Sequence, residues 1–359
     1  MTILGIESSC DETAAAVVRD GREVLANVVY TQIPLHQPYG GVVPEVASRA
    51  HIEKISGVVA EAMKGGEKID AVAVTYGPGL ASSLLVGLNA AKGLSLALGV
   101  PLIGVNHIEA HLHTPFLYDA PGEDQPAATV APESCMPALG LAVSGGHTTW
   151  VDMPAYGTYK IIGQTLDDAA GEAFDKAAKL LGLGYPGGPV IDRWAKAYWA
   201  AAGQSQSDAL PRFPKGHPRA GTAALAGLDA DLCVSFSGLK TALLYHVRQH
   251  PPADDAEKAG LVAAYQEAIV GTLADRTTTA LKRRQYKALI VGGGVSLNGR
   301  LRARLAEVAS AAGVPLLLAA PKYCGDNAAM IAGLAYWRRN LVGEAALLTD
   351  VNPTLQAGD

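Results

Sequence analysis

KALIVGGGVSLNGRLRARLAEVASAAGVPLLL, residues 287–318, decides the fold, because its order of segments also occurs earlier in the chain. An apolar run, a glycine turn, a helical segment and a second apolar run follow one another here. The same order appears in IDAVAVTYGPGLASSLLVGLNAAKGLSLALGVPLIGVN, residues 69–106. Apolar runs between turn residues predict buried strands, and apolar residues three and four apart predict helices. Each stretch therefore predicts one strand–helix–strand unit.

The similarity extends outward from both units. A strand and a hairpin precede each of them, in residues 3–29 around Asp20-Gly21 and in residues 138–153. A helical segment follows each of them, HIEAHLHTPF at 107–116 and CGDNAAMIAGLAYWRR at 324–339. A duplicated β-β-β-α-β-α-β-α unit predicts two α/β lobes that face a cleft. Open α/β sheets bind ligands at the carboxyl ends of their strands, which here line that cleft.

Composition narrows the class of protein. The chain has 359 residues, of which 49% are hydrophobic and 18% are charged, as is typical of a globular protein with more than one lobe. The net charge of −5 lacks the basic excess of a protein that binds nucleic acid by itself. A nucleic-acid substrate would therefore need a restricted patch or partner proteins. The basic runs at 282–284 and 300–304 are more often solvated helix faces.

The cysteines and the apolar stretches indicate the compartment. Cysteines stand at positions 10, 135, 233 and 324, without the spacing of a metal knuckle, a redox motif or a disulfide framework. The first ten residues lack the basic region and apolar run of a signal peptide. The most apolar stretch, residues 80–99, is interrupted by Asn89 and Lys92. We therefore expect a reduced, cytoplasmic protein without a membrane segment.

Three histidines crowd into VNHIEAHLHT, residues 105–114. In a helix, residues four apart lie on one face, about 40° apart, so His107 and His111 are expected to point the same way. His113 falls on roughly the opposite side and is expected at the surface. A zincin protease is excluded, because Glu109 lies about 200° round from His107. A histidine pair alone is more often structural or incidental than metal-binding.

The internal repeat supplies a third candidate ligand. It places Asp326, at the start of the 324–339 helix, opposite the start of the HIEAH helix. Asp326 could therefore face both histidines across the cleft. Two imidazoles and one carboxylate leave open coordination positions and suit Fe(II), Zn or a similar divalent ion. The alternative role for Asp326 is a helix N-cap, because a helical pattern starts at Asn327.

Two glycine turns follow predicted strands, in AVSGGHT at 142–148 and VGGGVSLNG at 291–299. Such turns let ligand phosphates approach backbone N–H groups, and a helix N-terminus after the second turn adds favourable partial charge. Leu297 occupies the third glycine's place of a dinucleotide fingerprint, and the absence of a Gly-Lys pair excludes a P-loop. Structural turns are the alternative; the paired occurrence favours a nucleotide.

LDDAAGEAFDKAAKLLGLGYPGGP, residues 166–189, predicts a helix capped by Asp167 and Asp168 and followed by a sharp turn. Asp175 lies within this helix and could bind ribose hydroxyls, although a solvated carboxylate is the alternative. Asp192 lies one helical turn beyond Gly188.

Taken together, these segments resemble the TsaD family, the universal tRNA N6-adenosine threonylcarbamoyltransferases, once called O-sialoglycoprotein endopeptidases. The resemblance runs from the N-terminus to about residue 340 and implies the ASKHA fold of actin-like ATPases and sugar kinases. It implies one lobe from residues 1–112 plus 325–350 and another from 113–324, with insertions near 119–137 and 200–231. The matching motifs are ILGIESSCDETAAAVV, KGLSLALGVPLIGVNHIEAHL, VSGGHT, DDAAGEAFDKAAKLLGLGYPGGP, FSGLKTA, GGGVSLNGRL and CGDNAAMIA.

The resemblance also implies an activity. Members of the family transfer a threonylcarbamoyl group from L-threonylcarbamoyl-AMP, which a separate enzyme makes. The acceptor is the N6 amine of the adenosine 3′ to the anticodon in tRNAs that read ANN codons, and AMP is released. His107, His111 and Asp326 match the family's metal ligands, usually described with iron and in some preparations with zinc. Bacterial members work with a TsaB-like paralogue and a TsaE-like ATPase.

The family's substrate-binding positions also map onto this chain. Ala142 is smaller than the leucine expected there. Asp11 and Glu12, directly after the first strand, are candidates for proton abstraction or for a metal-linked water, and turn residues are the alternative. The mapped binding positions are Ala142, Val143, Ser144, Gly145, Gly146, Asp175, Gly188, Asp192 and Asn298.

Two other functions are compatible with duplicated lobes. A small-molecule kinase or ATPase of the ASKHA fold would need a catalytic aspartate near the hinge and would leave the two-histidine site idle. A scaffold that only binds nucleotide and partner proteins would have no use for the metal ligands.

Overall fold

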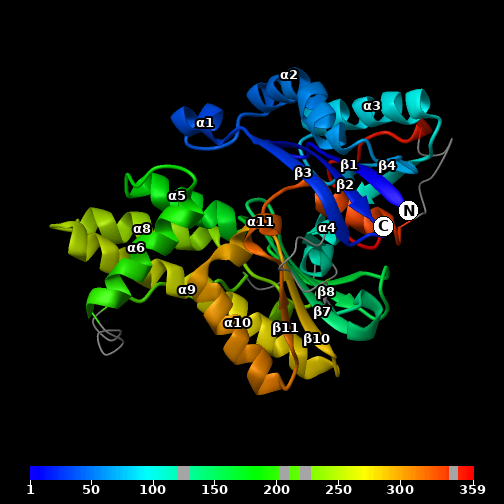
Figure 1. Cartoon of the computed structure of the whole chain (residues 1–359). Coiled ribbons are helices and arrows are strands. Elements are labelled where there is room, and N and C mark those ends of the chain that lie inside the picture. Colours follow the sequence, from blue (N-terminus) through cyan, green and yellow to red (C-terminus); the bar gives the residue numbers. More distant parts are fainter. Residues whose placement is uncertain (120–129, 203–209, 219–227, 339–346) are drawn as a thin grey trace.

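Two β-sheets surrounded by helices form two lobes in the computed structural model, which describes residues 1–119, 130–202, 210–218, 228–338 and 347–359 (Figure 1). The first sheet contains β1 (Thr2–Glu7), β2 (Glu12–Arg19), β3 (Glu23–Thr31), β4 (Ala71–Gly77), β5 (Leu102–Asn106) and β6 (Tyr118–Asp119), in the order β5-β4-β1-β2-β3-β6. The second contains β7 (Ala138–Val143), β8 (Thr148–Met153), β9 (Lys160–Gln164), β10 (Ala288–Gly292) and β11 (Leu316–Leu318), in the order β11-β10-β7-β8-β9.

The predicted duplication is confirmed by the strand order. Apart from the short β6, each strand of the first sheet has a counterpart in the second. The hairpin strands are antiparallel in both sheets. β4 and β10 pair parallel to the first strand of their repeat, and β5 and β11 pair parallel to β4 and β10. The first hairpin turns at Asp20 and Gly21, which both have positive φ angles of 50° and 72°. This is the two-residue turn that suits the twist of a hairpin.

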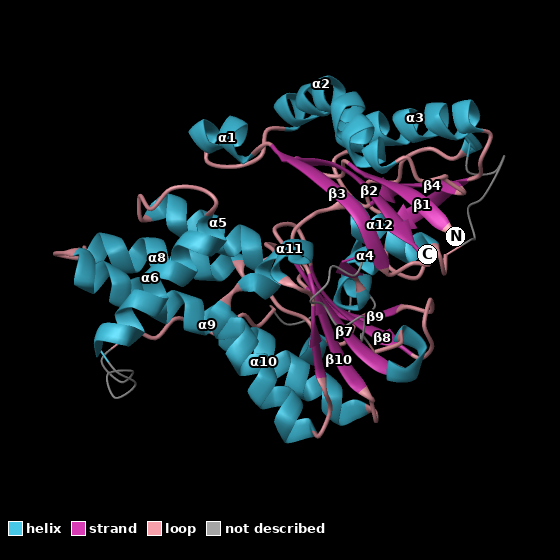
Figure 2. Ribbon diagram, viewed as in Figure 1, coloured by secondary structure: helices cyan, strands magenta, loops and turns pink. Residues whose placement is uncertain are grey.

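The helices cover both faces of the sheets (Figure 2). Between β3 and β4 the chain forms short α1 (Ile33–His36) and long α2 (Pro44–Ala62), whereas the described residues of the corresponding part of the second repeat contain four α-helices. These four are α5 (Ala170–Leu180), α6 (Gly187–Ala202), α8 (Ser237–Gln249) and α9 (Asp255–Arg283). The remaining helices are α3 (Ala81–Leu98), α4 (His107–His113), α10 (Gly299–Ala312), α11 (Pro321–Cys324) and α12 (Ala328–Ala335).

The last helix of each repeat packs against the sheet of the other repeat. Alternate residues of β1, such as Ile3 and Leu4, face opposite sides of the first sheet. One side packs against α2 and α3, and the other packs against α12. Helix α4 in turn packs through Ile108 and Leu112 against β7 and β10 of the second sheet. The exchange brings α4 and α12 into contact between the lobes.

Glycines permit this close packing. A Cβ on Gly5 of β1 would lie 2.4 Å from the carbonyl oxygen of Ala328 at the start of α12. A Cβ on Gly292 at the end of β10 would lie 2.0 Å from the carbonyl oxygen of His111 in α4. Both distances are too short for any side chain, so these positions let the two helices approach the sheets.

Helix α3 is long and apolar enough to cross a membrane, and no other helix in the described residues is. In this fold it packs against β4 and α2, and Leu84, Leu88 and Ala91 are buried there. Its apolar composition therefore has a role in the first lobe. All four cysteines are free, as predicted.

Most of the two predicted insertions, 119–137 and 200–231, lies outside the described residues. The described ends contain a short helical turn at Pro132–Cys135 and another at Ala230–Leu232. The division into one lobe of 1–112 plus 325–350 and another of 113–324 stays a proposal. The packing of α12 on the first sheet supports its 325–350 segment, whereas helix α4, at the end of the 1–112 segment, packs against the second sheet.

Candidate metal and substrate site

Helix α4 presents two histidines toward the space between the lobes. Asn106, the last residue of β5, caps the helix by accepting hydrogen bonds from the N–H groups of Ile108 and Glu109. His107 and His111 follow on one face, with ring centroids 4.6 Å apart, as their spacing predicts. Both side chains are buried.

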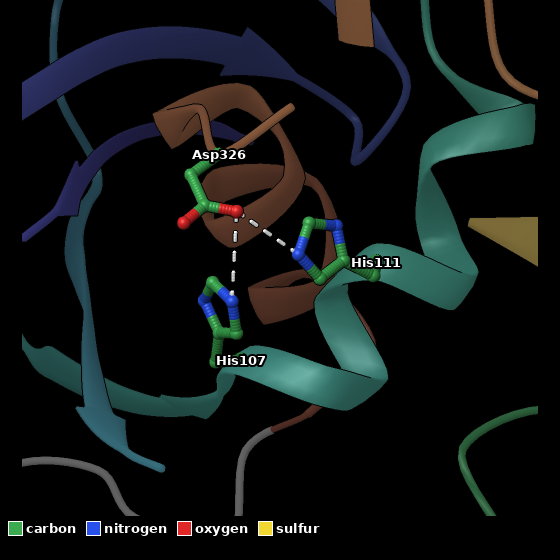
Figure 3. Close-up of side chains that lie close together, drawn as sticks. All are labelled: His107, His111 and Asp326. Atoms are coloured by element: carbon green, nitrogen blue, oxygen red, sulfur yellow. Dashed lines mark ion pairs between the residues drawn. The ribbon is translucent and has the colours of Figure 1, made fainter. Parts of the chain in front are cut away.

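Asp326 reaches these histidines from the turn between α11 and α12 (Figure 3). Its Oδ1 lies 3.1 Å from Nε2 of His111 and 3.6 Å from Nε2 of His107. The cap of α12 is Asn327, whose side chain accepts from the N–H of Met330, so the alternative role of Asp326 as an N-cap is wrong. One potential ligand atom from each of the three residues lies within 4.8 Å of the others.

A second layer of side chains orients His107. Its Nδ1 lies 3.2 Å from Oε2 of Glu7 and 3.2 Å from Oγ of Ser9, which leaves Nε2 facing Asp326. Glu7 in turn accepts hydrogen bonds from Thr75 Oγ1, at 2.6 Å, and from the N–H of Ser9, at 2.5 Å. Sequence reasoning missed these residues. A glutamate at the end of the apolar strand LGIE was the signal, because a buried charge needs a partner.

The electrostatics of the group favour a positive charge between its carboxylates. Burial acts to lower the pKa of His107, but Asp326 and Glu7 outweigh it and raise that pKa to about 9. Burial acts to raise the pKa of Asp326, and His107 and His111 hold it below its ordinary value. The pKa of His111 is lowered, mainly by burial.

These residues fit a divalent cation. Nδ1 of His111 is buried without a hydrogen-bond partner among the described residues, and Nε2 faces the Asp326 carboxylate at 3.1 Å. A buried imidazole normally has a partner, and a metal ion would supply one. A cation could likewise take the place of the proton that Asp326 and Glu7 favour on His107.

The loop between β1 and β2 brings Asp11 and Glu12 near this group. The pKa of Glu12 is raised well above its ordinary value, first by burial and then by Asp11 and Asp326. Its Oε1 accepts a hydrogen bond from Thr31 Oγ1 at 3.2 Å. The two carboxyls therefore share one partly enclosed space with Asp326. Their catalytic role stays a prediction.

A buried polar network holds this loop from behind. His51 of α2 donates from Nε2 to the carbonyl of Cys10, at 3.0 Å, and accepts at Nδ1 from Thr13 Oγ1, at 2.8 Å. The backbone N–H of Gln32 donates to the carbonyl of Asp11, at 2.9 Å. His36 links to Gln32 through Nε2, at 3.2 Å. The network therefore fixes the backbone carbonyl groups of Cys10 and Asp11.

The first glycine turn lies at the end of β7, opposite the loop of β1. Ala142 and Val143 are buried in the strand, whereas Gly145 and Gly146 are exposed, with open space where a Cβ would stand. The carbonyls of Ser144 and Gly145 accept from the first turn of α5. The turn thus leaves room for a ligand at its glycines.

The other mapped positions connect the second lobe's turns. Asp175 Oδ1 accepts from the N–H of Gly187, next to Gly188, at 2.6 Å; burial raises the pKa of Asp175 to about 6. Asp192 accepts from Gln266 and from the N–H of Gly299. Asn298 caps α10 through Oδ1.

The amide nitrogen of Asn298 is buried and has no partner among the described residues, so it is free to bind a ligand. The helix that it caps begins at Gly299, after a short turn at Gly294–Leu297. The helix N-terminus predicted after the second glycine turn is therefore present, a few residues further along the chain.

Three local predictions about side chains were wrong or incomplete. His113 is buried, not at the surface: Nε2 donates to the carbonyl of Gly21, Nδ1 accepts from Tyr156, and burial lowers its pKa to about 4. Helix α4 is enclosed by both lobes, so its far side is not solvent. Glu109 is also buried there and pairs with Arg338 at 3.0 Å, consistent with a face turned away from the metal ligands.

Asp167 and Asp168 do not cap α5, whose N-cap is Ala169. Asp167 instead accepts from the N–H groups of Phe236 and Ser237 at the start of α8. Asp168 pairs with Lys176 at 2.7 Å. Asp167 therefore joins segments far apart in the sequence, whereas Asp168 pairs with the adjoining helix α5.

The basic runs are partly committed to ion pairs rather than simply solvated. Arg284 pairs with Asp152 at 2.8 Å, and Arg300 pairs with Glu267 at 2.7 Å. Arg283 contacts Asp229. These contacts reduce the positive charge available to a polyanion.

His147 is a further site residue that sequence reasoning did not select. It ends the AVSGGH turn, and its ring centroid lies 6.0 Å from that of His107. Burial, together with His107 and His111, lowers the pKa of His147 to about 3. The signal was a histidine directly after a glycine turn that was predicted to bind phosphate.

The sequence and the fold were compared with known proteins. The sequence model of the TsaD family, described as tRNA N6-adenosine threonylcarbamoyltransferase, matches residues 23–333. A protein of that name from Anaeromyxobacter dehalogenans strain 2CP-C is 50% identical over 335 residues, which cover 92% of each chain. Another of that name from Clostridium perfringens strain SM101 is 44% identical over 362 aligned residues, which cover 99% of this chain and 98% of the relative.

Solved structures agree on the fold. Component A of (R)-2-hydroxyglutaryl-CoA dehydratase from Acidaminococcus fermentans has a TM-score of 0.51 and 13% identity, covering 94% of this chain and 97% of that one. HypF from T. kodakarensis has a TM-score of 0.55 and 14% identity, covering 94% of this chain and 47% of that one. At such low identity the likeness shows the fold alone, which is the predicted α/β ASKHA fold. The sequence matches extend over nearly the whole chain, and the chain belongs to the TsaD family of tRNA N6-adenosine threonylcarbamoyltransferases.

Proposed function

We propose that this chain transfers the threonylcarbamoyl group of L-threonylcarbamoyl-AMP to tRNA. The acceptor is the N6 amine of the adenosine 3′ to the anticodon in tRNAs that read ANN codons. The observation that carries the proposal is the convergence of His107, His111 and Asp326 from the two repeats of a TsaD-family chain. These three side chains lie beside glycine turns suited to a phosphate.

The three convergent residues would hold one divalent cation, for which Fe(II) is our first choice and zinc the second. The close approach of one potential ligand atom from each of the three residues supports metal binding. When bound, such an ion supplies Lewis acidity, polarising a carbonyl or neutralising a phosphate. Glu7 would keep the Nδ1 proton of His107 in place, so that Nε2 faces the ion.

The glycine turns would hold the adenylate. The backbone at Ser144, Gly145 and Gly146 has room for a phosphate, and the free amide nitrogen of Asn298 could donate to the nucleotide or to the threonine end. Asp175, Gly188 and Asp192 would shape the nucleoside pocket; both carboxylates already bind backbone N–H groups at its turns. Ala142 and Val143 would support the turn from within β7.

The reaction needs one bond made and one broken. The N6 nitrogen attacks the carbamoyl carbon, the bond from that carbon to the phosphate oxygen breaks, and AMP leaves with the electron pair. The nitrogen gives up a proton, for which Asp11 and Glu12 are the proposed acceptors; the raised pKa of Glu12 suits it to that role. The amine is a weak nucleophile, so positioning and a good leaving group dominate the barrier.

The net charge of −5 and the paired arginines support a need for help in holding tRNA. We propose a TsaB-like paralogue and a TsaE-like ATPase as the partners. A cytoplasmic location, where tRNA and the adenylate are available, belongs to the same proposal.

Mass spectrometry of tRNA nucleosides, after incubation with purified threonylcarbamoyl-AMP, tests the function. Wild-type protein with its partners should form N6-threonylcarbamoyladenosine, and His111→Ala should reduce the rate at least about 100-fold. His250→Ala is the matched control, because this histidine is exposed and follows the C-terminus of α8.

Full activity of His111→Ala would refute the role of the cation site. Phosphoryl transfer to a small molecule without any modified tRNA would instead favour an ASKHA kinase or ATPase. Metal analysis after anaerobic purification distinguishes the transferase from a binding scaffold, because only the transferase requires an ion.

A further inference from the structure

His147 lies where the glycine turn of the second lobe meets the histidine pair. Its backbone closes the turn: the N–H of Ser144 donates to the carbonyl of His147, at 2.8 Å, and the N–H of His147 donates to Oγ of Ser144, at 3.2 Å. The ring then lies 6.0 Å from the ring of His107, centroid to centroid, at an angle of 49°. The imidazole is thus fixed at the end of a short, closed turn.

The ring of His147 differs from the rings of His36, His51 and His113 in having no hydrogen-bond partner among the described residues. His36, His51 and His113 each use both ring nitrogens in hydrogen bonds to neighbouring groups. No described residue makes a hydrogen bond to either ring nitrogen of His147. His107 and His111, the proposed cation ligands, each face Asp326. The side chain is only partly buried, so a ligand in the site can reach it.

His147 is not a member of the cation group. In the described residues, the cluster whose ligand atoms all lie within 4.8 Å of one another contains His107, His111 and Asp326. His147 stands to the side of that cluster, toward Gly145 and Gly146. Its ring approaches that of His107, and its backbone closes the turn that contains Gly145 and Gly146.

We propose that His147 is a substrate-binding residue that donates a hydrogen bond to the phosphate of the acyl-adenylate. The inference rests on the proposed function and names a new contact within it. A neutral imidazole has one N–H donor, and the phosphate gains negative charge as its oxygen leaves the carbamoyl carbon. The bond therefore strengthens as AMP departs. The proton stays on His147, and no bond of the imidazole is made or broken.

Three substitutions test this contact. His147→Ala removes the donor, His147→Asn keeps an N–H near the place of Nδ1, and His147→Gln keeps one near the place of Nε2. We expect His147→Ala to lower kcat about 100-fold, with a smaller change in KM, because the contact is strongest in the transition state. One of the two amide variants should recover about tenfold of that loss and thereby identify the donating nitrogen.

Two readouts do not depend on turnover. Titration with AMP should show binding about tenfold weaker in His147→Ala than in the wild type, and the metal content after anaerobic purification should be unchanged. If wild-type protein binds AMP but modifies no tRNA, the proposed function fails while the AMP titration still tests His147. His250→Ala serves again as the control.

The inference is overturned by either of two results. One is His147→Ala with wild-type kcat and AMP affinity. The other is loss of the metal from His147→Ala, which would make the residue a ligand. If His147→Ala does not fold, the near-isosteric His147→Asn and His147→Gln variants carry the test. The inference is also overturned if both of these variants have the AMP affinity and the kcat of the wild type.

Discussion

Single residues in this site owe their chemistry to burial. Asp175 is an example at some distance from the proposed cation: its carboxylate accepts one short backbone hydrogen bond, yet burial raises its pKa to about 6 from an ordinary 3.8. The nearby Asp11 carboxylate raises the pKa further. The folded protein therefore holds a proton on Asp175 more tightly than the unfolded chain does.

Replacing Asp175 with Asn should change how stability depends on pH. The contribution of the Asp175 proton to stability is fully present below about pH 4 and is lost as the pH rises through about 6. Asn keeps an acceptor oxygen for the N–H of Gly187 but does not titrate. Relative to the wild type, Asp175→Asn should gain about 1–3 kcal/mol between about pH 4 and pH 7, measured by urea unfolding.

Asp255→Asn is the control for this series, because its side chain is 86% exposed at the start of α9. Its stability curve should run parallel to that of the wild type. A parallel curve for Asp175→Asn as well would contradict the raised pKa.

At the residue scale, the sequence predicted what depends on spacing alone. The four-residue interval of His107 and His111 sets their common face in any helix. Their partner Asp326 could be predicted because the repeat relates the starts of two helices. The burial of His113 could not, since it depends on Tyr156 and the turn at Gly21, which only the folded chain brings to it.

At the scale of elements, helix α2 does more than cover the first sheet. Through His51 it holds the carbonyl of Cys10, while Gln32 holds that of Asp11. These hydrogen bonds set the path of the loop that carries the two proposed proton acceptors. Thr13 and His51 are completely buried, so bulk water does not reach either side chain to replace a lost hydrogen-bond partner.

His51→Ala should affect both stability and catalysis. The buried hydroxyl of Thr13 loses its partner, which costs about 1–3 kcal/mol in unfolding free energy. The loop at Cys10 and Asp11 also loses an anchor, so kcat should fall about 100-fold while the AMP affinity changes little. Thermal unfolding and steady-state tRNA modification measure the two effects.

Ile52→Ala, at the neighbouring and 65% exposed position of α2, should leave both properties near the wild type. A His51→Ala protein that is less stable but retains its kcat would show that the network supports the fold only.

The elements themselves were largely predictable, because apolar periodicity is a local property. The helix caps were less so. Asp167 has the sequence position of a cap for α5, but it binds the start of α8, about 70 positions away in the chain. Local pattern contains no information on such a partner. In the same way, Asn327 rather than Asp326 caps α12: its Oδ1 accepts from the N–H of Met330, while its amide nitrogen donates to the carbonyls of Tyr323 and Gly325.

For the whole molecule, the decisive arrangement is the exchange of the last helices between the repeats. Gly5 allows α12 to lie on the first sheet, with the carbonyl of Ala328 where a side chain would stand. Asp326 immediately precedes that helix. The geometry of the proposed cation site therefore depends on packing far from the ligands themselves.

Gly5→Ala should lower both the stability of the fold and the retention of the proposed cation. The added Cβ would meet a backbone oxygen at 2.4 Å, so α12 must shift, and we expect a loss of about 1–3 kcal/mol in stability. The shift also moves Asp326, so less metal should be retained after anaerobic dialysis. Urea unfolding and metal analysis give the two values.

Gly57→Ala in α2 is the matched control, since no atom lies within 4 Å of the added Cβ. It should keep its metal and gain about 0.5–1 kcal/mol from the better helix former. Wild-type stability and metal retention in Gly5→Ala would show that the contact with α12 is not limiting.

The exchange of α4 and α12 has a mechanical consequence. The imidazoles stand on a helix that packs against the second sheet, and the carboxylate precedes a helix that packs against the first, so an ion bound to all three would join the two sheets. A rotation of one sheet relative to the other would lengthen or break the bonds between that ion and its ligands. By thermodynamic linkage, anything that favours the arrangement in which all three ligands meet raises the affinity for the ion, and removal of the ion weakens the preference for that arrangement.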